Sequence, residues 1–284
     1  MRDFDKLWDF NHPDETERKF RNLLVEVQHP AELDYKAELL TQIARTLGLQ
    51  KKFAKAHEVL NQVESDLTNT VPRTQIRYLL ERGRVFNSSA RQEEALPLFV
   101  EAWKLGCRYG EDELAVDAAH MLGIAESTPE RRMEWNMLAL EYAERHPNAS
   151  RWLGSLYNNI GWAQVEAGNL AEALDLFERA LQFRQGQGNA NLIFIAKWSV
   201  AKVLRLMDQT SKALELQLEL LKEIERGAES DGYVYEEIAE CLYTLDRRME
   251  ASSYFSKAYE LLSHDHWLTN NEPDRIARLK DLST

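Results

Sequence analysis

The chain has little of what marks a membrane protein, a secreted protein or an enzyme. Its 284 residues contain no apolar run of about 18 residues, and no apolar segment follows the opening Met-Arg-Asp-Phe-Asp. Two cysteines, Cys107 and Cys241, lie in distant parts of the sequence. We therefore expect neither a membrane span nor a secretory signal nor a disulfide, and a cytoplasmic location.

Motifs for catalysis and for metal binding are also lacking. The sequence contains no Gly-x-Ser-x-Gly, no His-Glu-x-x-His and no phosphate loop. His264-Asp265-His266 is the one metal-like cluster, and it lacks a third ligand at a fixed spacing. We expect no enzyme, no cofactor and no metal site.

Positive charge is in deficit, with 35 Lys and Arg against 47 Asp and Glu, a net charge of −12. Nucleic-acid binding depends on clustered cations that neutralise phosphates. The composition therefore predicts no nucleic-acid partner. With 44% hydrophobic and 29% charged residues, the chain has enough apolar material for a folded core.

The sequence does contain one amphipathic-helix pattern that occurs six times. We call the reference residue of each copy its anchor. The anchors recur at steps of 38 to 40 residues, at Ala56, Ala95, Trp135, Ala173, Ala213 and Ala251. Twelve residues before each anchor is a glycine or alanine: Ala44, Gly83, Gly123, Gly161, Ala201 and Ala239. So steady a period indicates stacked copies of one supersecondary unit, in which small residues let two helices approach closely.

The clearest copy runs from Leu156 to Leu181. It resembles the tetratricopeptide repeat family, with Ile160-Gly161 on the first helix (helix A), Gly168 at the turn, and Ala173, Phe177 and Ala180 on the second (helix B). The third copy departs from the pattern at Trp135, the second at Arg82 and the fifth at Gln217. The period is longer than the 34 residues usual for the family.

The repeats predict an all-α chain: a right-handed α-solenoid of about six helix–turn–helix repeats with capping helices at both ends. We place an N-terminal capping helix in 1–33, with one amphipathic helix from Asp14, and a C-terminal capping helix in 263–284. The six repeats occupy 34–262, at approximately 34–70, 73–109, 111–147, 151–187, 190–226 and 231–262.

The resemblance implies that the A helices line a concave groove. Residues near the small residue of each copy would then face a ligand: Gln42, Arg45, Arg77, Glu81, Arg84, Asn87, His120, Asn158, Asn159, Trp162, Trp198, Lys202 and Arg205. Read in this order, the groove begins basic, continues through amides and indoles, and ends acidic at Glu236, Glu237 and Glu240. Guanidinium groups in such a groove suit a carboxylate or phosphate.

Each set has a structural alternative. The groove arginines could pair with Glu38 and Glu81, the indoles could pack between repeats, and His120 could be a buried imidazole. Asn158 and Asn159 are adjacent amides inside a predicted helix. Because asparagine lowers helix propensity, we expect the pair to have a role, either in contacting a ligand or in capping between helices. One of them coincides with an asparagine that similar chaperone-tail binders use on a peptide backbone, but the paired cations of those binders are absent at Ile195 and Ser199.

These observations predict a non-catalytic scaffold that binds a peptide or an acidic segment of a partner protein. The alternative is a small-molecule or phosphoryl-ligand module in which His120 and Glu81 act together. A third reading is self-association into a homo-oligomer through convex or end surfaces. The sequence names no partner.

Overall fold

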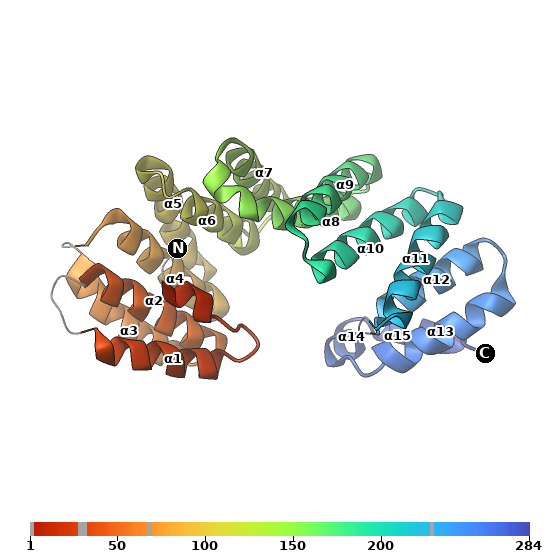
Figure 1. Cartoon of the computed structure of the whole chain (residues 1–284), viewed down its shortest axis with the longest axis horizontal. Helices are drawn as coiled ribbons and strands as arrows, with labels where there is room; N and C mark the ends of the chain where they lie inside the picture. The colour runs from red at the N-terminus through yellow and green to blue at the C-terminus, as the bar shows by residue number, and fades with distance from the viewer. Residues whose placement is uncertain (1–2, 28–32, 68–69, 228–229) are drawn as a thin grey trace. The chain divides into compact units, whose positions relative to one another are not determined.

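The computed structural model describes residues 3–27, 33–67, 70–227 and 230–284, and within these ranges every regular element is a helix (Figure 1). Residues 1–2 and 28–32 of the predicted N-terminal cap and residues 68–69 of the first repeat lie outside this description. Among the described helices, none is long and apolar enough to cross a membrane.

The six predicted helix–turn–helix pairs are present, so the all-α solenoid class is confirmed. In chain order the A and B helices are α2 (Leu33–Leu49) and α3 (Phe53–Asp66), α4 (Pro72–Ser88) and α5 (Gln92–Tyr109), α6 (Asp112–Ala125) and α7 (Pro129–Arg145), α8 (Leu153–Glu166) and α9 (Leu170–Gln187), α10 (Ala190–Leu206) and α11 (Thr210–Glu225), and α12 (Gly232–Thr244) and α13 (Arg248–Leu262).

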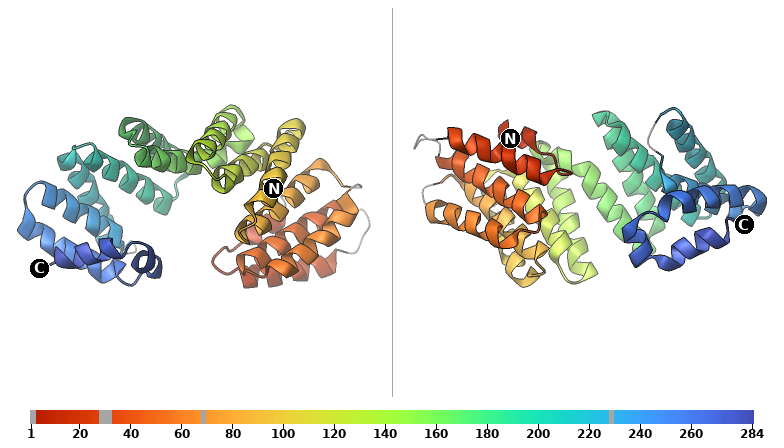
Figure 2. Two further views of the ribbon diagram at one scale, coloured as in Figure 1. Left: turned by 180° about the vertical axis from the view of Figure 1, so that it is seen from behind. Right: turned by 90° about the horizontal axis from the view of Figure 1, so that it is seen from below.

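The chain divides into two compact units, Met1–Leu156 and Tyr157–Thr284. In unit 1 the core gathers around Phe20, Ile43 and Leu60 in one cluster and around Phe99 and Leu122 in the next. In unit 2 one larger cluster holds the core. Consecutive helices pack as neighbours from α1 (Pro13–Glu26) to α7 in unit 1 and from α9 to α13 in unit 2, and Figure 2 shows them from two further sides.

The small residues are where helix A and helix B touch. A β-carbon built on Gly83 would lie 2.5 Å from the Phe99 ring, and one on Gly161 would lie 2.7 Å from the Phe177 ring. Both rings are fully buried. The recurring glycine therefore leaves room for the aromatic residue four positions after the anchor of the same copy.

The third copy keeps its glycine but changes the partner. Gly123 faces the Asn136 side chain, while Trp135 packs edge-on against Trp103 and donates to Glu126 through Nε1 (3.3 Å). Thr128 caps the following helix. The irregular anchor thus goes with a different A–B contact in this copy.

In five copies the A–B turn contains a left-handed residue seven positions after the small residue. These residues are Lys51, Ala90, Gly168, Asp208 and Asp246, with φ between 59° and 80°. The next backbone N–H returns to the carbonyl five residues earlier in each turn, for example Asn169 to Gln164 at 2.9 Å. This is the Schellman pattern that closes a helix, and Gly168 alone of the five has the residue type that favours it.

The ends differ from the sequence prediction. Helix α1 is Pro13–Glu26, so it begins one residue before the predicted start at Asp14. A 3-10 helix, η1 (Asp3–Leu7), precedes it and was not predicted; its Phe4 is fully buried. After the last repeat, 263–284 holds two short helices, α14 (His266–Asn271) and α15 (Pro273–Asp281).

Candidate functional site

The predicted site residues lie on A helices but are divided between the two units. Unit 1 holds Gln42 and Arg45 on α2, Arg77, Glu81, Arg84 and Asn87 on α4, and His120 on α6. Unit 2 holds Asn158, Asn159 and Trp162 on α8, and Trp198, Lys202 and Arg205 on α10. We describe the two sets separately.

In unit 1 the A helices border a pocket of about 200 Å³. It is lined by Asp5, Trp8, Phe10, Gln42, Arg45, Arg73, Arg77, Leu80, Glu81, Glu113, Leu114, Asp117 and Arg151. Four predicted residues are in that set: Gln42, Arg45, Arg77 and Glu81. The structure adds lining residues from the segment before α1 and from η4 (Pro147–Trp152).

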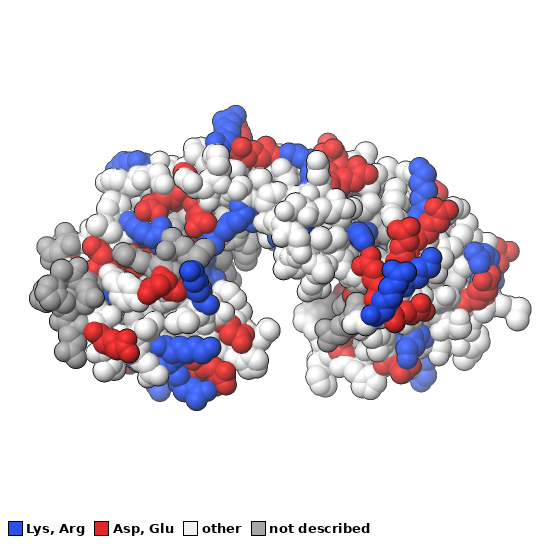
Figure 3. All heavy atoms as spheres, in the orientation of Figure 1, with Lys and Arg blue, Asp and Glu red and all other residues white. Residues whose placement is uncertain are grey.

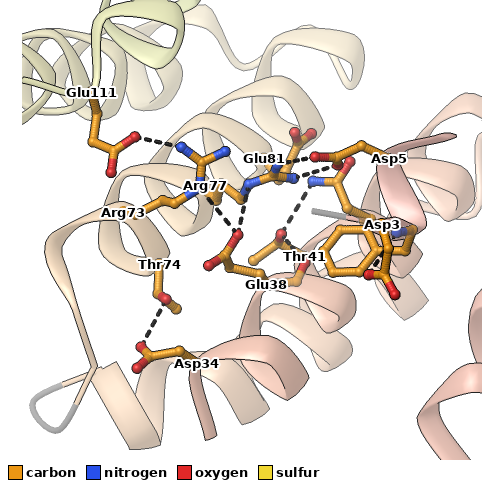
Figure 4. A network of polar contacts seen from close by, with 12 residues as sticks. Asp3, Asp5, Asp34, Glu38, Thr41, Arg73, Thr74, Arg77, Glu81 and Glu111 are labelled. Carbon is orange, nitrogen blue, oxygen red and sulfur yellow. Dashed lines mark hydrogen bonds and ion pairs between the residues drawn. The ribbon is translucent and has the colours of Figure 1, made fainter. Parts of the chain in front are cut away.

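The Glu38 carboxylate organises one wall of this region (Figure 4). Glu38 is fully buried on α2, and its Oε2 lies 3.1 Å from Arg77 Nε and 3.5 Å from Arg73 Nε. Arg77 also donates two hydrogen bonds to the Asp5 carboxylate, at 2.7 and 3.1 Å, and Arg73 donates one to Glu111. A buried carboxylate needs such partners, because an unpaired charge away from water is costly.

A second cluster links α2, α4 and α6. Arg84 Nη1 donates to Glu81 at 2.7 Å and Arg84 Nη2 donates to Asp117 at 2.5 Å, while Arg45 lies 3.4 Å from Glu81. Burial alone would raise the pKa of Asp117, but the charges of Arg84 and Arg45 hold it below its ordinary value. Burial and the neighbouring Arg84 lower the pKa of Arg45.

Arg45 is therefore the least compensated cation of the cluster. Its side chain is 28% exposed, and its carboxylate partner Glu81 is shared with Arg84. The guanidinium carbon lies 5.6 Å from the Trp8 ring centre and 5.4 Å from that of Phe10. Aromatic faces supply part of the stabilisation that a carboxylate would otherwise give.

Unit 2 repeats the pairing with other residues. Arg205 forms two hydrogen bonds to Glu237, at 2.7 and 3.0 Å, and Lys202 lies 3.3 Å from the same carboxylate. Arg275 and Arg278 of α15 pair with Glu236 and Glu240. Opposite charges lie side by side on the face shown in Figure 3. Cations and carboxylates of the predicted basic and acidic stretches therefore pair with opposite charges within each unit.

A sequence signal for these pairs exists. Arg45–Glu81, Arg84–Asp117, Arg73–Glu111, Arg205–Glu237, Arg275–Glu236 and Arg278–Glu240 join opposite charges 32 to 39 positions apart. That separation is close to one repeat. Opposite charges one period apart thus predict ion pairs between successive A helices, or between the last of them and α15.

Sequence reasoning missed the segment before α1 entirely. Trp8 donates through Nε1 to Gln42 Oε1 (3.1 Å), so the predicted groove amide Gln42 already has an internal partner. Trp8 stacks on Phe10 with ring centres 4.7 Å apart. The repeat period carries no information about this segment because it precedes the first copy.

Three predicted amides remain available. The side chains of Asn87, Asn158 and Asn159 form no hydrogen bond within the described residues, and Asn159 is exposed. Trp162, one turn after Asn158, has its ring centre 5.8 Å from that of Trp198. Lys202 Nζ lies 5.9 Å from the first ring and 4.9 Å from the second. Amides, indoles and a cation therefore meet on α8 and α10.

His120 of α6 packs against Trp152 of η4. Its ring centre lies 5.4 Å from that of Trp152, and its Nδ1 is buried without a hydrogen-bond partner in the described structure. Burial lowers the pKa of the imidazole, against the opposing charge of Asp117. Among the described residues, the hydrogen-bond partners of Glu81 are arginines and the ring contact of His120 is Trp152, so no direct contact joins His120 to Glu81. Among the residues that the structure describes, no group of three or more His, Cys, Asp or Glu side chains is placed to hold a metal ion.

Comparison with known proteins agrees with this architecture. Residues 153–185, which span α8 and most of α9, match the tetratricopeptide repeat family model. The chain is also similar to outer dynein arm-docking complex subunit 4 of Bos taurus, with 26% identity over 136 residues. That alignment covers 48% of this chain and 19% of the bovine protein, so the chain spans about a fifth of that relative's length.

Two solved structures show the same fold. A signal transduction ATPase with a tetratricopeptide repeat sensor from Pyrococcus horikoshii superposes with a TM-score of 0.75 at 15% identity, covering 93% of this chain and 42% of that one. NprR, solved with its cognate peptide NprX, gives a TM-score of 0.51 at 16% identity, covering 98% of this chain and 86% of that one.

Proposed function

We propose that this chain, whose fold is that of the tetratricopeptide repeat proteins, is a non-catalytic scaffold that binds a peptide segment of a partner protein along its A helices. The observation that carries the proposal is the pair of uncommitted amides on α8, Asn158 and Asn159, beside the indole of Trp162. The similar NprR structure contains a peptide. The same use of this fold supports the proposal by analogy.

The chemistry of the α8–α10 face suits a peptide main chain. Each asparagine side chain offers an acceptor oxygen and two donor hydrogens, which match the carbonyl and N–H of an extended segment. Trp162 and Trp198 offer apolar faces for alternate side chains, and large aromatics contribute strongly at such interfaces. Lys202, although close to Glu237, also lies over both rings and adds a donor at the same place.

The other predicted residues take a different part. Arg77, Glu81, Arg84 and Arg205 are engaged between repeats, so we assign them to positioning the A helices. The alternative of a small-molecule module around His120 has less support, because the described pocket in unit 1 is lined by Glu81 and not by His120.

Selection from a random peptide display library on the intact chain tests the proposal. We expect enriched peptides that bind the wild-type chain, and a loss of affinity of roughly tenfold in the double variant Asn158→Ala, Asn159→Ala, since a tenfold loss corresponds to about 1.4 kcal/mol. Asn270→Ala is the matched control, because that exposed amide lies on α14, outside the A helices.

Two results would contradict the proposal. One is that no peptide is enriched over a blank surface. The other is that the double variant keeps full affinity while its melting temperature matches that of the wild type, which would show that α8 does not contact the peptide.

A further inference from the structure

The segment Asp3–Phe10 is held in unit 1 by side chains, in the manner of a bound peptide. It forms no helix–turn–helix pair with another element. It packs on α1 through Phe4 and Trp8, whose rings contact Phe20. Two of its side chains also reach A helices: Asp5 accepts from Arg77 of α4, and Trp8 donates to Gln42 of α2. Both receiving residues are among those that face the pocket of unit 1.

Each contact has the chemistry of specific recognition. The Asp5 carboxylate accepts two hydrogen bonds from one guanidinium, at 2.7 and 3.1 Å, which is the bidentate geometry that makes arginine selective for carboxylates. Phe4 is fully buried, 5.2 Å from Tyr35 and 6.1 Å from Phe20 between ring centres. Trp8 inserts its N–H where a buried glutamine oxygen receives it.

The segment also completes the electrostatics of the face it covers. Arg77 has Glu38 on one side and Asp5 on the other, and Arg45 has a shared carboxylate on one side and the Trp8 and Phe10 rings on the other. Without the segment, two guanidinium groups of the pocket would each lose one of their partners. The face is complementary to a short segment that carries a carboxylate followed by two aromatic residues.

We propose that the face formed by Gln42, Arg45 and Arg77 is a receptor for acidic–aromatic peptide segments of the form Asp-x-x-Trp-x-Phe. Asp3–Phe10 is its built-in occupant, and a partner's segment of the same chemistry displaces it. This inference rests on the proposed scaffold function. It adds a second binding surface, in unit 1, which Asp3–Phe10 covers until a partner's segment displaces it.

The first test uses the unaltered chain and a synthetic peptide with the sequence of residues 3–10, Asp-Phe-Asp-Lys-Leu-Trp-Asp-Phe. Hydrogen exchange of the chain's own segment is followed as peptide is added. Displacement predicts faster exchange in Asp3–Phe10 while the α2 and α4 amides stay protected. Unchanged exchange at millimolar peptide overturns the proposal.

The second test weakens the internal occupant. In the variant Asp5→Asn, Trp8→Ala, which keeps the buried Phe4, the labelled peptide should bind at least about tenfold more tightly than to wild type, by loss of competition. A peptide carrying the same two changes and a scrambled peptide are controls that leave the protein untouched. Equal binding of all three peptides, or no gain in the variant, overturns the proposal.

The two proposals fail separately. If Asn158→Ala, Asn159→Ala has no effect on selected peptides but the segment is displaced, the α8 assignment falls and the receptor face stands. If the α8 variant loses its peptides while Asp3–Phe10 stays protected, the scaffold stands and the receptor face falls.

Discussion

At the scale of single residues, Gln217 stands out. It occupies the position of Phe99, Phe177 and Phe255 in other copies, is fully buried on α11, and neither of its amide atoms has a hydrogen-bond partner in the described structure. A buried unsatisfied amide costs about 1–3 kcal/mol. The family-like aromatic pattern is thus broken here at a cost to stability.

Replacing this amide should stabilise the chain. We expect Gln217→Leu to raise the free energy of unfolding by roughly 1–2 kcal/mol, since the apolar residue removes the desolvation cost at similar volume. Chemical denaturation monitored by circular dichroism measures it. Gln42→Leu is the matched control and should destabilise, because it removes the acceptor of Trp8. A loss of stability in both variants would contradict the prediction.

At the scale of helix pairs, packing depends on the absence of single methyl groups. We expect Gly161→Ala to destabilise by about 1–3 kcal/mol, because its β-carbon would lie 2.7 Å from the buried Phe177 ring. Gly48→Ala, whose β-carbon would lie 3.6 Å from Val85, should instead stabilise by up to about 1 kcal/mol through helix propensity. Equal melting temperatures for the two variants would refute this account.

The A–B turns give the opposite expectation for glycine. Ala90 has a φ of 60°, which costs an L-residue roughly 1 kcal/mol. Ala90→Gly should therefore raise the melting temperature even though it touches nothing in the core. Gly168→Ala, at the equivalent position of the fourth copy, should lower it. If both changes lower it, the conformational argument is wrong.

The helix pairs were predictable from the sequence, but the segment before α1 was not predicted, and the ion pairs between A helices were predicted only as an alternative. The period located the six helix pairs, because small residues at fixed offsets report close helix contacts directly. It could not locate Phe4, Asp5 and Trp8, which belong to no repeat. It assigned the groove arginines to a ligand because free and paired guanidinium groups look alike in sequence. The separation of one period between opposite charges would have distinguished them.

At the scale of the whole molecule, two half-buried histidines, His57 and His120, predict how stability varies with pH. Burial lowers the pKa of both His57 and His120 in the folded chain. Between about pH 7 and 5 the unfolded chain, with histidine pKa values near 6.5, then binds more protons than the folded chain. The free energy of unfolding should therefore decrease as the pH falls through this range.

Denaturation at a series of pH values tests this expectation. The double variant His57→Gln, His120→Gln should show a smaller decrease than the wild type. His12, whose pKa is raised by its hydrogen bond to Asp9, acts in the opposite direction and is retained in both proteins. An identical pH dependence of the two proteins would rule out His57 and His120 as the cause.

The ion pairs between neighbouring A helices have a consequence for the order of the copies. Ile195 and Asn191 stand in the fifth copy where Arg77 and Arg73 stand in the second. A chain with these two copies exchanged would keep every small residue and every anchor, yet Glu38 would be buried without either arginine. The repeats share their small residues and anchors, but their ion pairs are specific to neighbouring repeats. A variant in which repeats are shuffled, deleted or transplanted therefore has to keep both partners of each ion pair.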